Sequence, residues 1–267
     1  MIEGKFCDDC HHKSEDLQYK CCFQVKKNEE IQVCFVETAD RDYIVSRALL
    51  KLGLIEEALF HISQALEKYL KSILLYENCT VRNISHKIGQ LRDKVKEKLG
   101  IDPDLDIQVW NQKYSFYDTI EFNNDRYGII AAPELNFLSF LDEAVFKIRK
   151  YCRDIDLEAT ICKESREEYI RTICPLNPKI GAYLERVLES SKESSQEILL
   201  QKEILCWKNK YAPMNVLNIF TTRNMNIKRQ LFDEGPLCQK SLETWRKDNY
   251  KVTPAQEQYL KLFGRIP

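Results

Sequence analysis

The chain has 267 residues, and its 40 basic and 41 acidic side chains leave a formal net charge of −1. A hydrophobic fraction of 44% excludes a wholly disordered chain, and the balanced charge provides no global basic field to hold nucleic acid, so any such contact needs a local patch. Glycine and proline occur only 8 times each, which favours a mostly helical fold. No apolar run approaches the ~20 residues of a membrane span, and the N-terminal residues lack the apolar stretch of a signal peptide. We therefore expect a cytoplasmic protein with no membrane segment.

Residues 1–37 form a segment rich in cysteine that differs from the rest of the chain. Its thiols lie beside His11 and His12, and they are ligand types that suit zinc. Cys21 and Cys22 are adjacent, however, and neighbouring side chains rarely both reach one ion. Buried free thiols and a redox role therefore remain alternatives to a zinc site. The candidate ligands are Cys7, Cys10, Cys21 and Cys22.

The end of this segment alternates between apolar and polar side chains. Ile31, Val33 and Phe35 repeat with a period of two, which indicates a short strand. Phe23 and Val25 repeat the pattern before residues 26–30. We therefore expect a small hairpin here.

From residue 38 the apolar period changes to that of a helix. The pattern predicts a helix over residues 40–52, ended by Gly53, and then an antiparallel helix of about 22 residues. The second helix has one apolar face at 3- and 4-residue spacing. Its members are Ile55, Ala58, Leu59, Ile62, Leu66, Tyr69, Leu70 and Ile73.

Further helices are predicted toward the C-terminus. Ser85 is expected to cap a helix that ends at Gly100, and Pro133 to begin another that runs to Cys152. Residues 156–267 read as a helical extension, with one long helix over residues 179–211 whose polar centre is residues 190–195. A capping box at Thr253 predicts a last helix that ends at Gly264.

Four motifs follow one another between Ala39 and Arg153. They are an opening helical pair (Asp42-Tyr43, Ala48-Leu49-Leu50, Gly53 and Glu57-Ala58), the helix over residues 60–71, His86 with Leu91, and the loop Asp125-Arg126-Tyr127. Together these motifs resemble the HEPN domain, a small helical bundle of prokaryotic nucleotide- and RNA-related systems. The resemblance implies an all-α fold: an up-and-down bundle of four to five helices over residues 38–155, commonly a homodimer.

The resemblance also implies two kinds of activity. Many members of the family are metal-independent RNases that use an arginine followed after a few residues by a histidine. Others bind nucleotide or partner a nucleotidyltransferase, as in toxin–antitoxin type systems. This chain departs from the RNase pattern: Arg82 is the nearest arginine before His86, and residues 124–153 contain no histidine.

Two groups of side chains are candidates for a site. The first lies on one edge of the second predicted helix and reads either as a solvated face or, after dimerisation, as a groove wall that binds phosphate or a nucleotide. It contains His61, Gln64, Lys68 and Lys71, with Glu67 as an i, i+4 partner of Lys71. The resemblance adds Arg126 and Tyr127 to the ligand-binding set.

The second group would serve an atypical RNase. His86 at a helix start either acts as a base toward a ribose 2′-OH or bonds a neighbouring loop. Arg126 either clamps a phosphate or pairs with a carboxylate such as Glu67. Because the arginine–histidine pattern is absent, we expect a non-catalytic HEPN module that binds nucleotide, RNA or a partner protein and needs no cofactor. The alternatives are a metal-independent endoribonuclease that uses His86 and Arg126, and a structural protein that docks a partner.

Overall fold

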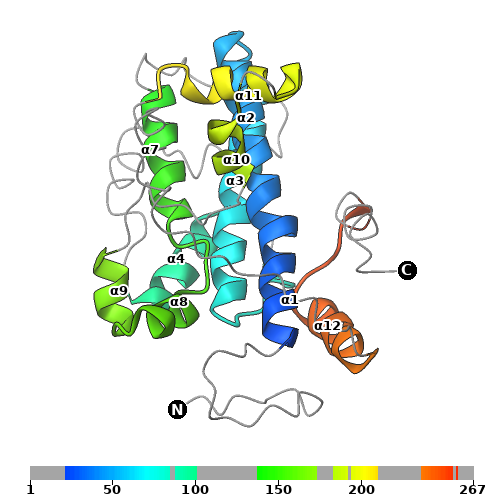
Figure 1. The fold of residues 1–267 in the computed structure, drawn as a ribbon. Helices are drawn as coiled ribbons and strands as arrows, with labels where there is room; N and C mark the ends of the chain where they lie inside the picture. Colours follow the sequence, from blue (N-terminus) through cyan, green and yellow to red (C-terminus); the bar gives the residue numbers. More distant parts are fainter. Residues whose placement is uncertain are drawn as a thin grey trace.

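The computed structural model describes residues 22–84, 88–100, 137–172, 183–191, 194–209, 236–254 and 257. These residues form helices and no strand, so the predicted all-α fold is confirmed (Figure 1). The elements are α1 (Cys22–Ile31), the π-helical turn η1 (Gln32–Val36), α2 (Glu37–Lys51), α3 (Ile55–Tyr76), α4 (Ile88–Leu99), α7 (Phe137–Arg149), α8 (Ile155–Cys162), α9 (Arg166–Thr172), α10 (Tyr183–Glu189), α11 (Gln196–Cys206) and α12 (Pro236–Asn249). Within the described ranges, no helix combines the length and apolarity that crossing a bilayer requires.

The first three elements form one continuous helix, so the predicted hairpin over residues 23–35 is wrong (Figure 1). Ile31, Cys34, Phe35 and Ala39 are each at most 5% exposed, and their 3- and 4-residue spacing is helical. Val33, by contrast, is only half-buried. The predicted strand rests on three apolar residues and on counting Cys34 as polar. Cys34 is buried with its apolar neighbours, so the alternation does not exist. The predicted boundary at residue 37 falls inside this helix.

The α2–α3 hairpin agrees with the sequence prediction. Gly53 adopts φ +78°, a left-handed conformation that favours glycine, and the amide of Leu54 donates to the carbonyl of Leu49 at 2.9 Å to close the turn. The predicted face of α3 lies in the core. Its buried members, each at most 2% exposed, are Ala58, Leu59, Ile62, Leu66, Tyr69, Leu70 and Ile73.

Helices α4 and α7 add further buried side chains to the core around α3. Leu91 and Val95 of α4 are buried, as are Leu141 and Val145 of α7. Gly100 adopts φ +70° at the end of α4, where the sequence predicts the helix to stop. The predicted starts at Ser85 and Pro133 lie outside the described residues, as does most of the predicted last helix up to Gly264.

The single long helix predicted over residues 179–211 is wrong, because α10 ends at Glu189 and α11 begins at Gln196. The hydroxyl of Ser190 donates to the carbonyl of Val187 at 2.7 Å. Ser195 then caps α11 by accepting from the amide of Ile198 at 3.4 Å. Serine side chains that bond nearby backbone compete with helix continuation, and here they end one helix and start the next.

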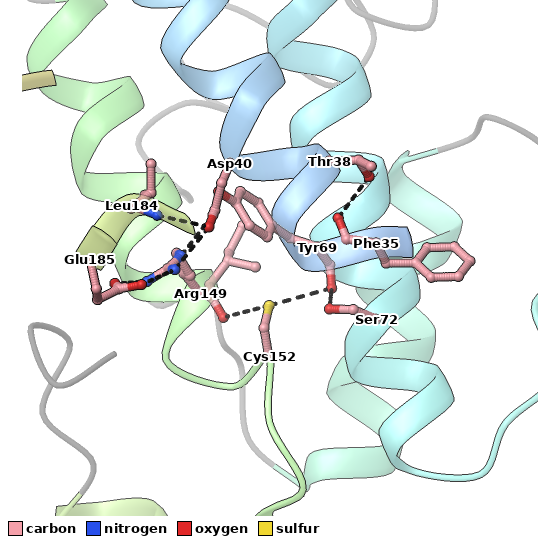
Figure 2. A network of polar contacts seen from close by, with 10 residues as sticks. Phe35, Thr38, Asp40, Tyr69, Ser72, Arg149, Cys152, Leu184 and Glu185 are labelled. Atoms are coloured by element: carbon pink, nitrogen blue, oxygen red, sulfur yellow. Dashed lines mark hydrogen bonds and ion pairs between the residues drawn. The ribbon is translucent and has the colours of Figure 1, made fainter. Parts of the chain in front are cut away.

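A buried cluster around Arg149 joins four helices (Figure 2). Its guanidinium donates to both oxygens of Asp40, at 2.8 and 2.9 Å, and to both oxygens of Glu185, at 2.5 and 2.8 Å. The hydroxyl of Tyr69 donates to Asp40 at 2.6 Å. Burial alone would lower the pKa of Arg149, but the two carboxylates raise it well above its ordinary value. The guanidinium therefore stays charged and ties α7 to α2, α3 and α10.

Asp40 belongs to a series of charged side chains along the first continuous helix, each paired with a residue from later in the chain. The acidic members lie in the first part of the series and the basic members in the last part. We call these contacts the ion-pair series: Glu30–Arg246, Glu37–Arg186, Asp40–Arg149, Arg47–Asp142 and Lys51–Glu203. The series links α7, α10, α11 and α12 to the first helix, and its pairs at Glu30, Asp40 and Arg47 are buried at both ends.

We expect Arg149→Met to lower the free energy of unfolding by about 3–5 kcal/mol, because it leaves buried carboxylates without a cation. Lys147→Met on the same helix is the matched control, since the half-buried Lys147–Glu143 pair should contribute less than about 1 kcal/mol. Urea unfolding followed by circular dichroism measures both. Equal losses in the two variants would contradict a structural role for the buried cluster.

Candidate docking face on helices α2 and α3

The predicted edge of α3 lies against α2 and centres on Asp42, a residue that the sequence analysis did not select as a site residue. Nδ1 of His61 lies 3.0 Å from one oxygen of Asp42, and Nζ of Lys68 donates to the other. The side chains of His61 and Lys68 are only 31% and 26% exposed. The edge is therefore a half-buried polar seam rather than a fully solvated face.

The predicted pair of Glu67 and Lys71 is confirmed. Nζ of Lys71 lies 2.5 Å from the carboxylate of Glu67 at i, i+4 spacing, and the two side chains are 16% and 8% exposed. Gln64 is half-buried on the same helix. Each lysine of the predicted ligand set thus already contacts a carboxylate.

The two sides of α2 make different contacts. At about 100° per residue, Asp40, Arg47 and Lys51 point one way, toward the elements that the ion-pair series holds in place. Asp42 lies on another side of the helix, where it contacts α3, and Val45 lies on the exposed surface beside it. Val45 is eight positions before Gly53 and His61 eight positions after it, so antiparallel packing puts them at the same height.

Apolar side chains are exposed on and beside this seam. Val45 is 39% exposed, Leu52 73%, Leu54 43% and Phe60 55%. The rings of Phe60 and His61 meet edge to face, with centroids 5.4 Å apart. Exposed apolar side chains that gather in one region can mark an interaction site, so this surface is a candidate for one. We call this surface the docking face: Asp42, Val45, Leu52, Leu54, Phe60, His61, Gln64 and Lys68.

Several candidate residues cannot be placed in this surface. His86, Arg126, Tyr127, Cys7, Cys10 and Cys21 lie outside the described residues, and Cys22 is the first residue of α1. Among the described residues, no three or more His, Cys, Asp or Glu side chains are grouped to hold a metal ion. The zinc site and the His86–Arg126 pair therefore stay predictions from the sequence.

The docking face lies within a recognised domain. Residues 34–125 match the family model of the HEPN domain, so the predicted family is confirmed for about a third of the chain. The matched segment includes α2, α3 and α4. No curated protein and no solved structure matches the chain.

The described cysteines are free thiols that differ in exposure. Cys152 is buried beneath the Arg149 cluster (Figure 2), where burial raises the pKa of its thiol to about 12, although Ser72 and Arg149 oppose the shift. Cys162 is exposed. Because the thiolate is the reactive form, the two positions should differ in reactivity.

We expect iodoacetamide to alkylate Cys162 in the folded chain at least about a hundredfold faster than Cys152 at neutral pH, as read by peptide mass spectrometry.

The raised pKa of Cys152 has a second consequence, since on raising the pH this thiol loses its proton in the unfolded chain before it does so in the folded chain. The stability that Cys152 contributes is complete below about pH 9 and is lost as the pH rises toward 12. The difference in unfolding free energy between the wild type and Cys152→Ala should therefore shrink with rising pH. A constant difference would contradict this account.

A double-mutant cycle tests the polar seam. Asp42→Asn and Lys68→Met should show a coupling energy of about 0.5–1 kcal/mol in the free energy of unfolding, because they remove the two ends of a half-buried ion pair. In the control cycle, Lys71→Met replaces Lys68→Met. Its coupling with Asp42→Asn should not exceed about 0.3 kcal/mol, since Lys71 pairs with Glu67. Equal couplings would show that Asp42 does not select Lys68.

Proposed function

We propose that this HEPN-domain protein is a binding module without catalytic activity of its own, and that its docking face takes a protein partner. The observation that supports this most is the set of exposed apolar side chains beside charges that are already paired. Phe60 and Leu52 expose more than half of their surface, while His61 and Lys68 share Asp42. Protein interfaces combine apolar contact area with polar groups that are already satisfied, and this face offers both.

The same contacts argue against a phosphate ligand on this face. A nucleotide or RNA phosphate would compete with Asp42 for Lys68 and with Glu67 for Lys71. Non-specific affinity for nucleic acid grows with the number of cations that neutralise phosphates, and these cations are neutralised within the chain. Binding of nucleotide or RNA is therefore the second candidate.

The first partner to test is a second copy of this chain. The HEPN resemblance implies a homodimer, and the α2–α3 hairpins of two copies would form a four-helix interface. In a two-fold dimer the same patch faces itself, which suits a face that carries both an acid and bases. A nucleotidyltransferase is the other protein that the resemblance implies.

We expect the wild type to associate with rising concentration in sedimentation velocity, and Phe60→Ser to weaken the association at least about tenfold, because a large exposed ring is the kind of side chain that anchors an interface. Leu200→Ser is the matched control: Leu200 is 57% exposed but belongs to α11. Equal effects of the two substitutions would show that the docking face has no special role.

Other outcomes would overturn the proposal. If the wild type stays monomeric and binds single-stranded RNA, and Lys71→Ala weakens that binding in a salt-dependent way, the phosphate-binding candidate replaces it. If the wild type cleaves RNA in the presence of a chelator and His86→Ala abolishes cleavage, the RNase alternative replaces it.

A further inference from the structure

Helix α12 is attached to α1 through a buried charge cluster. The guanidinium of Arg246 donates to both oxygens of Glu30, at 2.6 and 2.8 Å, and the hydroxyl of Tyr250 donates to the same carboxylate. Glu30 is 0% exposed. The ring of Tyr250 meets Phe35 edge to face at 4.9 Å, and Leu242 is also buried. Leu242 and Arg246 of α12 and Tyr250, the residue directly after its end, follow one another at four-residue spacing, so the anchors lie on one edge.

The C-terminal end of α12 is held by residues 80–82. A helix end leaves four carbonyls without partners inside the helix. Here the amide of Val81 donates to the carbonyl of Asn249 at 3.0 Å, the hydroxyl of Thr80 to that of Asp248 at 3.0 Å, and the guanidinium of Arg82 to that of Lys247 at 2.7 Å. The segment between α3 and α4 therefore recognises a helix end, not only a side chain.

These contacts define a receptor surface for a helix. Figure 1 shows α12 on the outer side of α1, apart from α7 to α11. The surface has a carboxylate for an arginine and a tyrosine, an aromatic ring from Phe35, and hydrogen-bond donors for the helix end. It uses α1, η1 and residues 80–82, so it shares no residue with the docking face on α2 and α3.

We propose that α12 is an intramolecular ligand of this helix-binding surface, and that the surface binds another amphipathic helix when α12 is displaced. The partner helix presents an arginine and a tyrosine one turn apart, with a leucine one turn before the arginine. While α12 is docked it excludes such a partner, because a tethered ligand acts at an effective concentration on the order of millimolar. The contact is therefore autoinhibitory toward this partner.

The experiment uses full-length chains and a fluorescent peptide of residues 236–252. By fluorescence anisotropy, the wild type should bind the peptide weakly, because its own α12 competes. Arg246→Ala weakens the tethered competitor and should tighten peptide binding at least tenfold. Adding Glu30→Gln to that chain should abolish the gain, since the arginine of the peptide then meets a neutral amide.

Two controls separate the surface from general destabilisation. Arg186→Ala removes another member of the ion-pair series, the contact with Glu37, and should leave peptide binding at the wild-type level. Hydrogen exchange should show that Arg246→Ala speeds exchange in α12 and at Val81 but not in α3. If Arg246→Ala unfolds the bundle, Tyr250→Phe replaces it, because it removes one bond to Glu30 and keeps the guanidinium.

Two outcomes of the peptide titration would overturn the proposal: no tighter peptide binding by Arg246→Ala or its replacement, or tighter binding that persists with Glu30→Gln. Exchange of α12 and α3 as a single unit would also overturn it, since α12 would then not detach separately. None of these measurements involves Phe60, so their failure is distinguishable from failure of the docking face.

Discussion

The fold depends on the need to pair the buried guanidinium of Arg149. An uncompensated charge in the core would cost several kcal/mol, so α7 can pack against α2 only when Asp40 meets it, and α10 must bring Glu185 to the same place. Tyr69 on α3 occupies a further position around Asp40. This requirement joins Asp40 to residues more than a hundred positions away, and it is strict in geometry because both carboxylates contact the guanidinium with both oxygens. The cluster thus selects one arrangement among the many that apolar packing alone would allow.

The helices of the bundle could be predicted because their signals are local. The apolar face of α3 repeats over five turns, and Gly53 and Gly100 lie where helices stop. Residues 22–36 show where such reasoning fails. The alternation of Ile31, Val33 and Phe35 is too short to distinguish two periods, and the burial of Cys34 becomes visible only in the folded chain. The break between α10 and α11 was similarly hidden, since a serine-rich stretch continues or ends a helix according to which backbone groups its hydroxyls bond.

The residues of the candidate site on α3 could be predicted from the sequence of that helix alone, but their partner on α2 could not. The 3- and 4-residue spacing of His61, Gln64, Lys68 and Lys71 places them on one edge, but spacing within one helix says nothing about the neighbouring helix. Asp42 changes the chemistry of that edge by pairing with His61 and Lys68. Its position eleven residues before Gly53, opposite Gln64 eleven residues after it, was the available signal. Aligning the two helices of the hairpin about Gly53 would have identified Asp42.

The charges of this nearly neutral chain are organised so that different sides of one long helix serve different contacts. One side of α2 holds the C-terminal elements through Asp40, Arg47 and Lys51, a second side packs on α3, and a third exposes Val45 beside the polar seam. An ion pair needs opposite charges on its two partners. The side of α2 that binds the chain's own helices therefore discriminates among them more strictly than apolar contact would. The exposed side has few such demands, since its charges are paired within the α2–α3 hairpin. Under the proposed function, internal pairing leaves shape and apolar area to select the protein partner.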